Sequence, residues 1–188
     1  MTPRPAVVVR TPAKINLALM VGPVRPDGFH DLASVYQAVD LYDEVRAESA
    51  PAGEISVVVS GPGADRVPLG RDNLAVQAAR MLADQLGADE GVRLSIRKGI
   101  PVAGGMAGGS SDAAAALVAC DALWKTGLDW SDLLTLAARL GSDVPFCVLG
   151  GTALGTGHGE LVTPLPVRGE YTWVLAFDSE GLSTPAVY

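Results

Sequence analysis

The residues best suited to chemistry in this sequence form one glycine-rich segment, Pro101-Val102-Ala103-Gly104-Gly105-Met106-Ala107-Gly108-Gly109-Ser110-Ser111-Asp112. It follows an apolar run that predicts a strand over 92–96 and precedes an alanine-rich run that predicts a helix over 110–124. The first N–H groups of a helix lack internal partners and attract anions, and glycine lets the backbone approach closely. The segment therefore predicts a phosphate-binding loop.

Two well-known nucleotide-binding patterns do not match this segment. A Walker A loop requires a lysine after Gly109, and the G-x-G-x-x-G dinucleotide pattern requires a glycine where Ala107 stands. A flexible turn before a well-capped helix is the alternative interpretation. The agreement of strand, loop length, paired serines and helix favours phosphate binding. Ser110 and Ser111 add hydroxyl donors or a magnesium ligand.

A lysine and an asparagine share one side of a predicted strand near the N-terminus. Residues 15–21 have the aliphatic composition of a strand, in which alternate side chains point to opposite faces. Lys14 and Asn16 therefore lie on one face, roughly 7 Å apart, and Ala18 and Met20 continue it. We expect this face to be partly buried, so that the lysine needs an anion or a carboxylate partner. A solvated edge face is the alternative.

A candidate carboxylate lies in the segment Leu140-Gly141-Ser142-Asp143-Val144-Pro145-Phe146. Proline is favourable in the first turn of a helix, so a short helix is predicted to begin at Ser142 or Asp143. Taken alone, Asp143 fits a helix cap as well as it fits a reactive carboxylate.

The predicted elements run in the order strands, helices, strands, which indicates an α+β fold rather than a doubly wound parallel sheet. Neither an internal repeat nor a clean linker is present, so one main domain is predicted over residues 1–188. The predicted strands are 7–10, 15–21, 35–41, 44–48, 55–59, 92–96, 151–155 and 171–177, and the predicted helices are 74–86, capped by Asn73 and ended by Gly87, then 110–124 and 131–140.

The composition disfavours several classes of protein. The net charge of −7, from 21 acidic and 14 basic residues, argues against a nucleic-acid partner. We find no apolar run of about 18 residues and no secretory signal in the first ten, so we expect a cytoplasmic protein with no membrane partner. Cys120 and Cys147 are predicted to be buried thiols in a reducing compartment, and His30 and His158 lie apart from any cysteine cluster.

Four segments together resemble the GHMP kinases, a family that phosphorylates small metabolites. They are Pro12-Ala13-Lys14-Ile15-Asn16-Leu17, Asp27-Gly28-Phe29-His30-Asp31-Leu32, Pro101 to Asp112, and Leu140 to Phe146 with Gly150-Gly151 beyond. They occur in the family's order across nearly the whole chain. The P-A-K-I-N-L and G-S-D-V-P-F pieces are specific to one branch, whose substrate is a cytidine-diphosphate methylerythritol of isoprenoid precursor biosynthesis.

The resemblance implies an N-terminal ATP-binding domain whose mixed or antiparallel sheet is packed by helices, with ATP as phosphate donor and Mg²⁺ bound with it. Asp143 would accept the proton of the substrate hydroxyl, while Lys14 would hold Asp143 ionised and stabilise the developing alkoxide. The implied ATP-binding positions are Asn73 and Lys98 beside the adenosine, then Pro101, Val102, Ala103, Gly104, Gly105, Met106, Ala107, Gly108, Gly109, Ser110 and Ser111 around the triphosphate, with Ser111 nearest to magnesium.

The same resemblance implies a substrate side made of Asn16, Phe29, His30, Asp143 and Tyr188. The family stacks cytosine on an aromatic ring, here Phe29, and reads its edge with the histidine. Tyr188 would supply a second ring. The family usually has tyrosine at the position of Phe29 and glycine at the positions of Ala103 and Ala107.

The resemblance also places the start of a C-terminal domain near residues 180–188 and the remainder of that domain outside this sequence. One alternative is another GHMP kinase that acts on a different alcohol and has no cytidine preference. A second is a nucleotide-binding module without turnover, and a third is a purely structural α+β domain. The presence of Phe29 and His30 favours a cytidine substrate over the first alternative. Measured turnover would exclude the other two.

Overall fold

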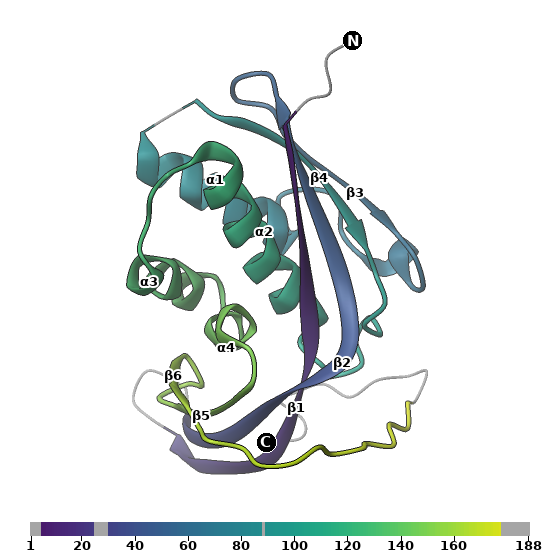
Figure 1. The fold of residues 1–188 in the computed structure, drawn as a ribbon, viewed down its shortest axis with the longest axis vertical. Helices are drawn as coiled ribbons and strands as arrows, with labels where there is room; N and C mark the ends of the chain where they lie inside the picture. The colour runs from purple at the N-terminus through teal and green to yellow at the C-terminus, as the bar shows by residue number, and fades with distance from the viewer. Residues whose placement is uncertain (1–4, 25–29, 88, 178–188) are drawn as a thin grey trace.

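The computed structural model describes residues 5–24, 30–87 and 89–177. Its largest feature is a pair of long antiparallel strands, β1 (Ala6–Val24) and β2 (His30–Ala50), which run together along the length of the molecule (Figure 1). Strand β1 is rich in β-branched residues, and β2 contains three valines and two tyrosines, residue types that favour the extended backbone. This pair forms the frame against which the other elements pack.

The sequence predicts two shorter strands in place of each long one, and the structure corrects this. The register of β1 against β2 shifts between Pro12 and Ala13, and again between Asn16 and Ala18. A bulge disturbs the two-residue alternation of side chains without ending the pairing. The pattern therefore looks interrupted although the strand continues, and the two shifts flank Lys14.

The second edge of β2 is shared by two strands. The upper part of β2, residues 44–50, pairs antiparallel with β4 (Gly91–Arg97), and its lower part, residues 34–37, pairs antiparallel with β5 (Thr152–Thr156). Residues 38–43 lie between these two pairings. Loops from other parts of the chain approach the sheet at this gap, so it becomes important for the site.

Two further strands complete the sheet. Strand β3 (Ile55–Ser60) pairs parallel with β4, and β6 (Leu161–Pro164) pairs antiparallel with β5. The sheet is thus mixed, and helices pack on it, which confirms the α+β fold predicted from the order of elements. Strand β6 is short and was not predicted.

The helices lie together on one face of the sheet (Figure 1). They are α1 (Leu74–Leu86), α2 (Gly108–Trp124), α3 (Trp130–Leu140) and α4 (Val144–Leu149), and a 3₁₀ turn covers Ala64–Arg66. Helix α2 is the central one, and its alanines 113–116 and 119 are buried in the main core. Small side chains let it pack closely against the sheet and against the other helices.

Local signals explain where these helices begin and end. The side chain of Asn73 accepts hydrogen bonds from the N–H groups of Ala75 and Val76, and Gly87 ends α1 with a left-handed φ of 60°. Asp129 begins α3 with a capping box. Each device satisfies backbone groups that a helix end leaves without partners, and the predicted bounds of α1 are confirmed.

Residues 171–177 differ from the prediction of a strand, because they form no regular element. A strand needs a neighbour to pair with, and none accompanies this segment among the described residues. A side-chain contact holds it instead, since Trp173 Nε1 donates to Gln37 Oε1 at 3.0 Å. The predicted thiols Cys120 and Cys147 are buried and not linked in a disulfide.

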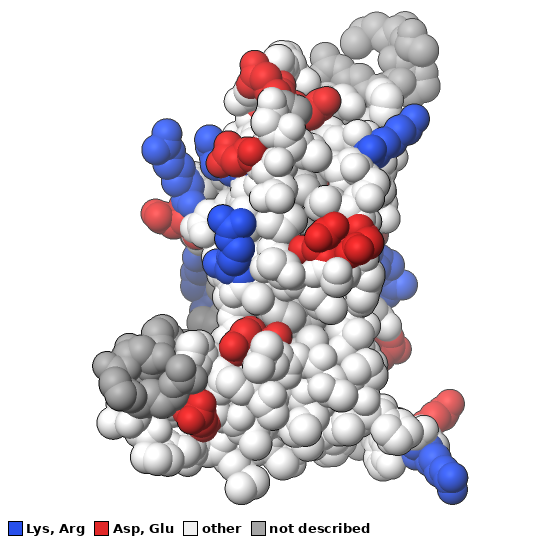
Figure 2. Space-filling model, turned by 90° about the vertical axis from the view of Figure 1, so that its left-hand side faces the viewer, with Lys and Arg blue, Asp and Glu red and all other residues white. Residues whose placement is uncertain are grey.

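The surface carries charges of both signs. Figure 2 shows the helix side of the molecule, where lysine and arginine side chains are interspersed with aspartate and glutamate side chains. Of the helices in the described ranges, none combines the length and the apolar character needed to cross a membrane.

Candidate active site

The glycine-rich loop between β4 and α2 has a distinctive backbone. Ala103, Gly105 and Ala107 have φ values of 61°, 69° and 59°, whereas the residues between them do not have positive φ. Alternation of this kind turns successive N–H groups toward one side, which creates a concave site for an anion. A left-handed backbone costs a residue with a Cβ about 1–2 kcal/mol, so the two alanines hold strain that serves the shape of the loop.

A pocket of about 320 Å³ opens beside this loop. Its lining consists of the loop and the start of α2, residues 101–110, together with residues 66–68, Leu74, Lys98 and Asp112. The N–H groups of residues 108–110 stand in the first turn of α2 and have no acceptor within the helix. The pocket is therefore surrounded by backbone donors that suit a phosphate group.

A lysine and an aspartate far apart in sequence meet close to the loop. Lys14 Nζ lies 3.1 Å from Asp143 Oδ2 and 3.1 Å from Asn16 Oδ1. It also lies 5.0 Å from the centroid of the Tyr36 ring, a cation–π contact. The Lys14 side chain is 7% exposed and that of Asp143 is 29% exposed. The carboxylate can therefore reach a ligand while the ammonium stays within the protein.

The surroundings of Asp143 separate the two interpretations of this residue. It stands at the N-cap position of α4, yet its side chain makes no capping hydrogen bond. The carboxylate turns toward Lys14 instead. The capping interpretation is therefore wrong, and the prediction that Lys14 has a carboxylate partner is confirmed.

The predicted buried face of β1 is corrected in one respect. Only Lys14 of this face is buried, whereas Asn16, Ala18 and Met20 are exposed. Leu17 and Leu19 on the opposite face are exposed as well, so this part of β1 is covered on neither side by the described residues. Lys14 owes its burial to residues from other elements, among them Tyr36 and Asp143.

The lysine–aspartate pair and the loop are physically joined. The N–H of Lys14 donates to the carbonyl of Met106 in the loop at 3.1 Å. The hydroxyl of Ser111 in α2 donates to the carbonyl of Pro12 at 2.9 Å. These two bonds fix β1 against the start of α2, so the reactive pair and the phosphate-binding loop form one site.

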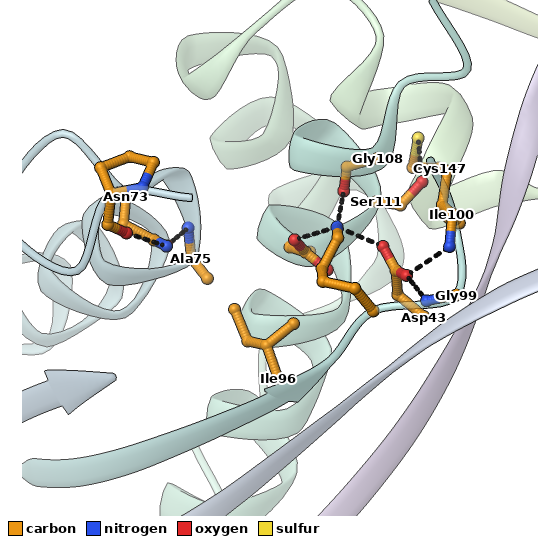
Figure 3. Close-up of polar contacts among 12 residues, drawn as sticks. Asp43, Asn73, Ala75, Ile96, Gly99, Ile100, Gly108, Ser111 and Cys147 are labelled. Carbon is orange, nitrogen blue, oxygen red and sulfur yellow. Dashed lines mark hydrogen bonds and ion pairs between the residues drawn. The ribbon is translucent and has the colours of Figure 1, made fainter. Parts of the chain in front are cut away.

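A buried charge cluster supports the same loop. Lys98 Nζ lies 2.5 Å from Asp43 Oδ2 and 2.6 Å from Asp112 Oδ2, and all three residues are buried. Figure 3 shows Asp43 directed toward the N–H groups of Gly99 and Ile100, to which its other oxygen is hydrogen-bonded. The cluster carries one ammonium and two carboxyl groups directly under the segment that leads into the loop.

Comparison with known proteins agrees with this geometry. The profile of the family described as "GHMP kinases N terminal domain" matches residues 73–151, which include the loop and Asp143. The chain carries the N-terminal domain of the GHMP kinase family. In sequence it is 57% identical, over 97% of its length, to a protein of Streptomyces coelicolor named 4-diphosphocytidyl-2-C-methyl-D-erythritol kinase, and 56% identical to the protein of that name from Leifsonia xyli.

Solved structures give the same picture of the GHMP kinase domain. A crystal structure titled 4-(cytidine 5'-diphospho)-2C-methyl-D-erythritol kinase has a TM-score of 0.70 and 38% identity, and the match covers 86% of this chain and 56% of that one. A homoserine kinase from Cytophaga hutchinsonii, with a TM-score of 0.66 and 20% identity, shares the fold. The chain spans about 60% of the length of its sequence relatives, 61% for Streptomyces coelicolor and 60% for Leifsonia xyli.

Both positions that the resemblance assigned to adenosine make structural contacts in this GHMP kinase domain. Asn73 is buried, and its side chain caps α1 and donates to the carbonyl of Pro68 at 2.8 Å. It therefore shapes the pocket wall from behind rather than lining it. Lys98 lines the pocket, but its ammonium is occupied by Asp43 and Asp112.

The assignment of magnesium to Ser111 is not favoured by the structure. Its side chain is fully buried, and its hydroxyl donates to the carbonyl of Pro12 and contacts the sulfur of Cys147 at 3.4 Å. Burial raises the pKa of the Cys147 thiol to about 12. Ser110, which lines the pocket, is better placed than Ser111 to meet a phosphate or an ion.

The predicted substrate residues are only partly within the described ranges. Phe29 and Tyr188 lie outside them. His30 begins β2, and its Nδ1 donates to the carbonyl of Gly22 at 2.7 Å, which orients the ring. Asn16 lies beside Lys14, and its Nδ2 donates to Ser34 Oγ at 2.6 Å.

Sequence reasoning missed Ser34, Asp43 and Tyr36. Ser34 is fully buried and links Asn16 to the carbonyl of Ala18, so it helps to hold Asn16 beside the lysine. No local pattern marks Ser34 or Tyr36. No local pattern marks Asp43 either, because Asp40 and Glu44 close to it are also acidic and are not buried.

The surroundings of Asp112 predict an unusual effect of pH on stability. Burial raises the pKa of Asp112 to about 7, although Lys98 opposes the shift. Between about pH 4 and pH 7 the folded protein then holds this proton more tightly than the unfolded chain. The stability contributed here is complete below about pH 4 and is lost as the pH rises to about 7.

We therefore expect the free energy of unfolding of the natural protein to lose this contribution as the pH rises from about 4 to about 7, whereas Asp112→Asn has no such proton to lose. The stability of Asp112→Asn relative to the natural protein should thus increase over this pH range. Urea denaturation at several pH values would measure this difference. Asp121→Asn, further along α2 and outside the cluster, is the matched control for loss of a carboxyl group. A difference between Asp112→Asn and the natural protein that does not change with pH would contradict the expectation.

Proposed function

We propose that the full-length protein containing this chain transfers the γ-phosphate of ATP to the 2-hydroxyl of 4-diphosphocytidyl-2-C-methyl-D-erythritol, a step of isoprenoid precursor biosynthesis. The observation that carries the proposal is the contact of Lys14 with Asp143 at 3.1 Å beside the glycine-rich loop. The names of the relatives that share more than half of this sequence support the substrate. ATP and this alcohol are its proposed partners.

The loop supplies the binding of ATP. Its left-handed residues and the first turn of α2 present backbone N–H groups to the 320 Å³ pocket. These groups would hold the β- and γ-phosphates, because helix N-termini and concave loops bind anions. Phosphoryl transfer needs positioning and charge stabilisation more than covalent chemistry, and a fixed set of donors provides both.

Magnesium fits this arrangement as a companion of ATP. The described residues contain no group of three or more His, Cys, Asp or Glu side chains that would hold a metal ion by themselves. Mg²⁺ is commonly bound by substrate phosphates, water and one or two protein oxygens. The hydroxyl of Ser110 is the pocket oxygen that suits this role. When bound, the ion would neutralise charge on the phosphates.

The lysine–aspartate pair supplies the chemistry at the alcohol. Asp143 would accept the proton of the attacking hydroxyl, and its partial exposure leaves it within reach of a substrate. Lys14 would stabilise the negative charge that develops on the attacking oxygen. A positioned general base contributes about 10²- to 10⁴-fold to a rate.

The cytidine end of the substrate would lie near His30, with Phe29 and Tyr188 as stacking rings. Aromatic faces stack on any base, so discrimination between cytosine and uracil requires a polar reader. The ring of His30 is oriented by its bond to Gly22, which suits it for this task. Asn16, next to Lys14, would contact the methylerythritol part.

We also propose that residues 1–188 comprise the N-terminal domain and the start of a C-terminal domain near 180–188. A cytoplasmic location is proposed as well, and the free thiols of Cys120 and Cys147 favour it. Two alternatives remain for the activity. One is a GHMP kinase for another alcohol, and the other is a nucleotide-binding module without turnover, which the Lys14–Asp143 contact disfavours.

A substrate panel tests the proposal. The full-length protein would be supplied with ATP, Mg²⁺ and, in turn, the cytidine-diphosphate methylerythritol, its uridine analogue, homoserine and mevalonate. We expect ADP release to depend on the cytidine compound and to be weaker with the uridine analogue. Equal activity with homoserine or mevalonate would favour another GHMP kinase, and nucleotide binding without ADP release would favour the inactive module.

A further inference from the structure

Asp43 lies in the part of β2 between the pairings with β4 and β5, and every side of its carboxylate is engaged. Oδ1 accepts the N–H groups of Gly99 at 2.7 Å and Ile100 at 2.8 Å, and Oδ2 accepts from Lys98 at 2.5 Å (Figure 3). The chain passes so closely here that a Cβ on Gly99 would lie 2.4 Å from the carbonyl oxygen of Tyr42. Asp43 thus fixes the backbone where β4 ends and the loop begins.

Lys98 connects Asp43 to the other end of the loop. Its Nζ donates to Asp112 Oδ2 at 2.6 Å and to the carbonyl of Gly108 at 3.4 Å, both in the first turns of α2. Residues 101–107 are therefore held at both ends by one buried cluster. The bond from the N–H of Lys14 to Met106 adds a third anchor within the loop.

Stability alone explains this cluster poorly. Burying charged groups is costly, and apolar residues of similar volume often give equal or greater stability. Apolar residues cannot reproduce the directed hydrogen bonds from Gly99 and Ile100 to the carboxylate, which are charge-assisted and short, or the longer contact of Lys98 with Gly108. The arrangement suits a requirement for a fixed loop shape.

We propose that Asp43 is a positioning residue of the nucleotide site, acting with Lys98 to hold the glycine-rich loop in the shape that receives the triphosphate. Asp43 is 0% exposed, so it acts on the nucleotide through the loop and not by contact. The inference rests on the proposed function for the identity of the ligand. It predicts that loss of Asp43 weakens nucleotide binding and leaves the alcohol site largely unaffected.

Two variants of the full-length protein distinguish the contribution of the Asp43 charge from that of the Lys98 contacts. Asp43→Asn keeps an oxygen that accepts from Gly99 and Ile100 but removes the charge that faces Lys98. Lys98→Met keeps the contacts of Asp43 with the backbone but removes those with Gly108 and Asp112. Titration calorimetry with a non-hydrolysable ATP analogue and Mg²⁺ would give the Kd, and steady-state kinetics would give the KM of each substrate.

A destabilised control distinguishes positioning from a general loss of stability. Leu82→Ala removes a fully buried side chain of α1 that belongs to the main core. This change should lower the melting temperature by leaving a cavity, and it touches no part of the cluster. All variants would be compared at a temperature at which each is folded, as shown by circular dichroism.

We expect both cluster variants to raise the Kd of the ATP analogue at least about fivefold, with the KM of the alcohol changed by less than about twofold. Leu82→Ala should change neither constant despite its lower melting temperature. Unchanged nucleotide affinity in both variants, or equal weakening of both substrates, would overturn the inference. Failure of the natural protein to bind the analogue would instead overturn the proposed function. If Asp43→Asn does not fold, Asp43→Glu, which keeps the charge but displaces it, takes its place, because Lys98 itself lines the pocket and Lys98→Met cannot decide alone.

Discussion

Replacing Asp143 with asparagine in the full-length protein should lower kcat by about 10²- to 10⁴-fold while the melting temperature stays close to that of the natural protein. Asparagine keeps the size of the side chain and an oxygen for Lys14, but it cannot accept the proton of the alcohol. Lys14→Ala should also remove most of the turnover, because it deletes the ammonium that lies 3.1 Å from the carboxylate. Steady-state kinetics with circular dichroism would measure both effects.

A second aspartate at a helix N-cap provides a control for this prediction. Asp129 also stands at a helix N-cap, but its side chain accepts a hydrogen bond from the N–H of Asp132, whereas that of Asp143 makes no capping bond. We expect Asp129→Ala to lower the melting temperature with kcat unchanged. Asp143→Asn should instead lower kcat with the melting temperature unchanged. A kcat near that of the natural protein in Asp143→Asn would show that this carboxylate is not the base.

Replacing Gly105 with valine should weaken ATP binding by about tenfold or more. Gly105 has a φ of 69°, and a Cβ there would meet no atom within 4 Å, so the penalty lies in the backbone and not in a clash. A β-branched residue is poorly tolerated at such a φ, and the cost of about 1–2 kcal/mol corresponds to roughly a tenfold change in affinity. Calorimetric titration with the ATP analogue would measure it.

Gly127 is the matched control for Gly105. It lies between α2 and α3, has a φ of 73°, and a Cβ there would also meet nothing within 4 Å. Gly127→Val therefore carries the same backbone penalty away from the pocket, and we expect normal ATP affinity. Equal loss of affinity in the two variants, or equal weakening of ATP and alcohol binding by Gly105→Val, would contradict a phosphate-binding loop.

The parts of the site that the sequence predicts correctly are those with local patterns. The loop before α2 combines glycines, serines and a helix start within a few residues, so its backbone and its pocket could be expected from the sequence. A carboxylate partner of Lys14 was expected from a buried strand face; the partner is present, although Lys14 alone of that face is buried. The choice of Asp143 came from resemblance, because 129 residues separate the two and no local rule connects them.

The parts that the sequence does not predict depend on contacts between distant segments. Asp43 and Lys98 are separated by 55 residues, and they meet only because β4 pairs with β2 and then turns across it. The helix pattern over 110–124 does not distinguish Asp112, which is buried, from Asp121, which is half-buried on the same helix. The bulges that place Lys14 arise from the pairing of β1 with β2, which no single strand pattern specifies.

The most direct test of the proposed activity is phosphorus NMR of the reaction product. The full-length protein would be incubated with ATP, Mg²⁺ and 4-diphosphocytidyl-2-C-methyl-D-erythritol, and Asp143→Asn would serve as the control. We expect a new phosphomonoester signal on the 2-hydroxyl of the methylerythritol, together with one ADP for each ester formed, and neither product with Asp143→Asn at the same enzyme concentration and time. ATP that stays intact, or a phosphate found at another position, would contradict the proposal.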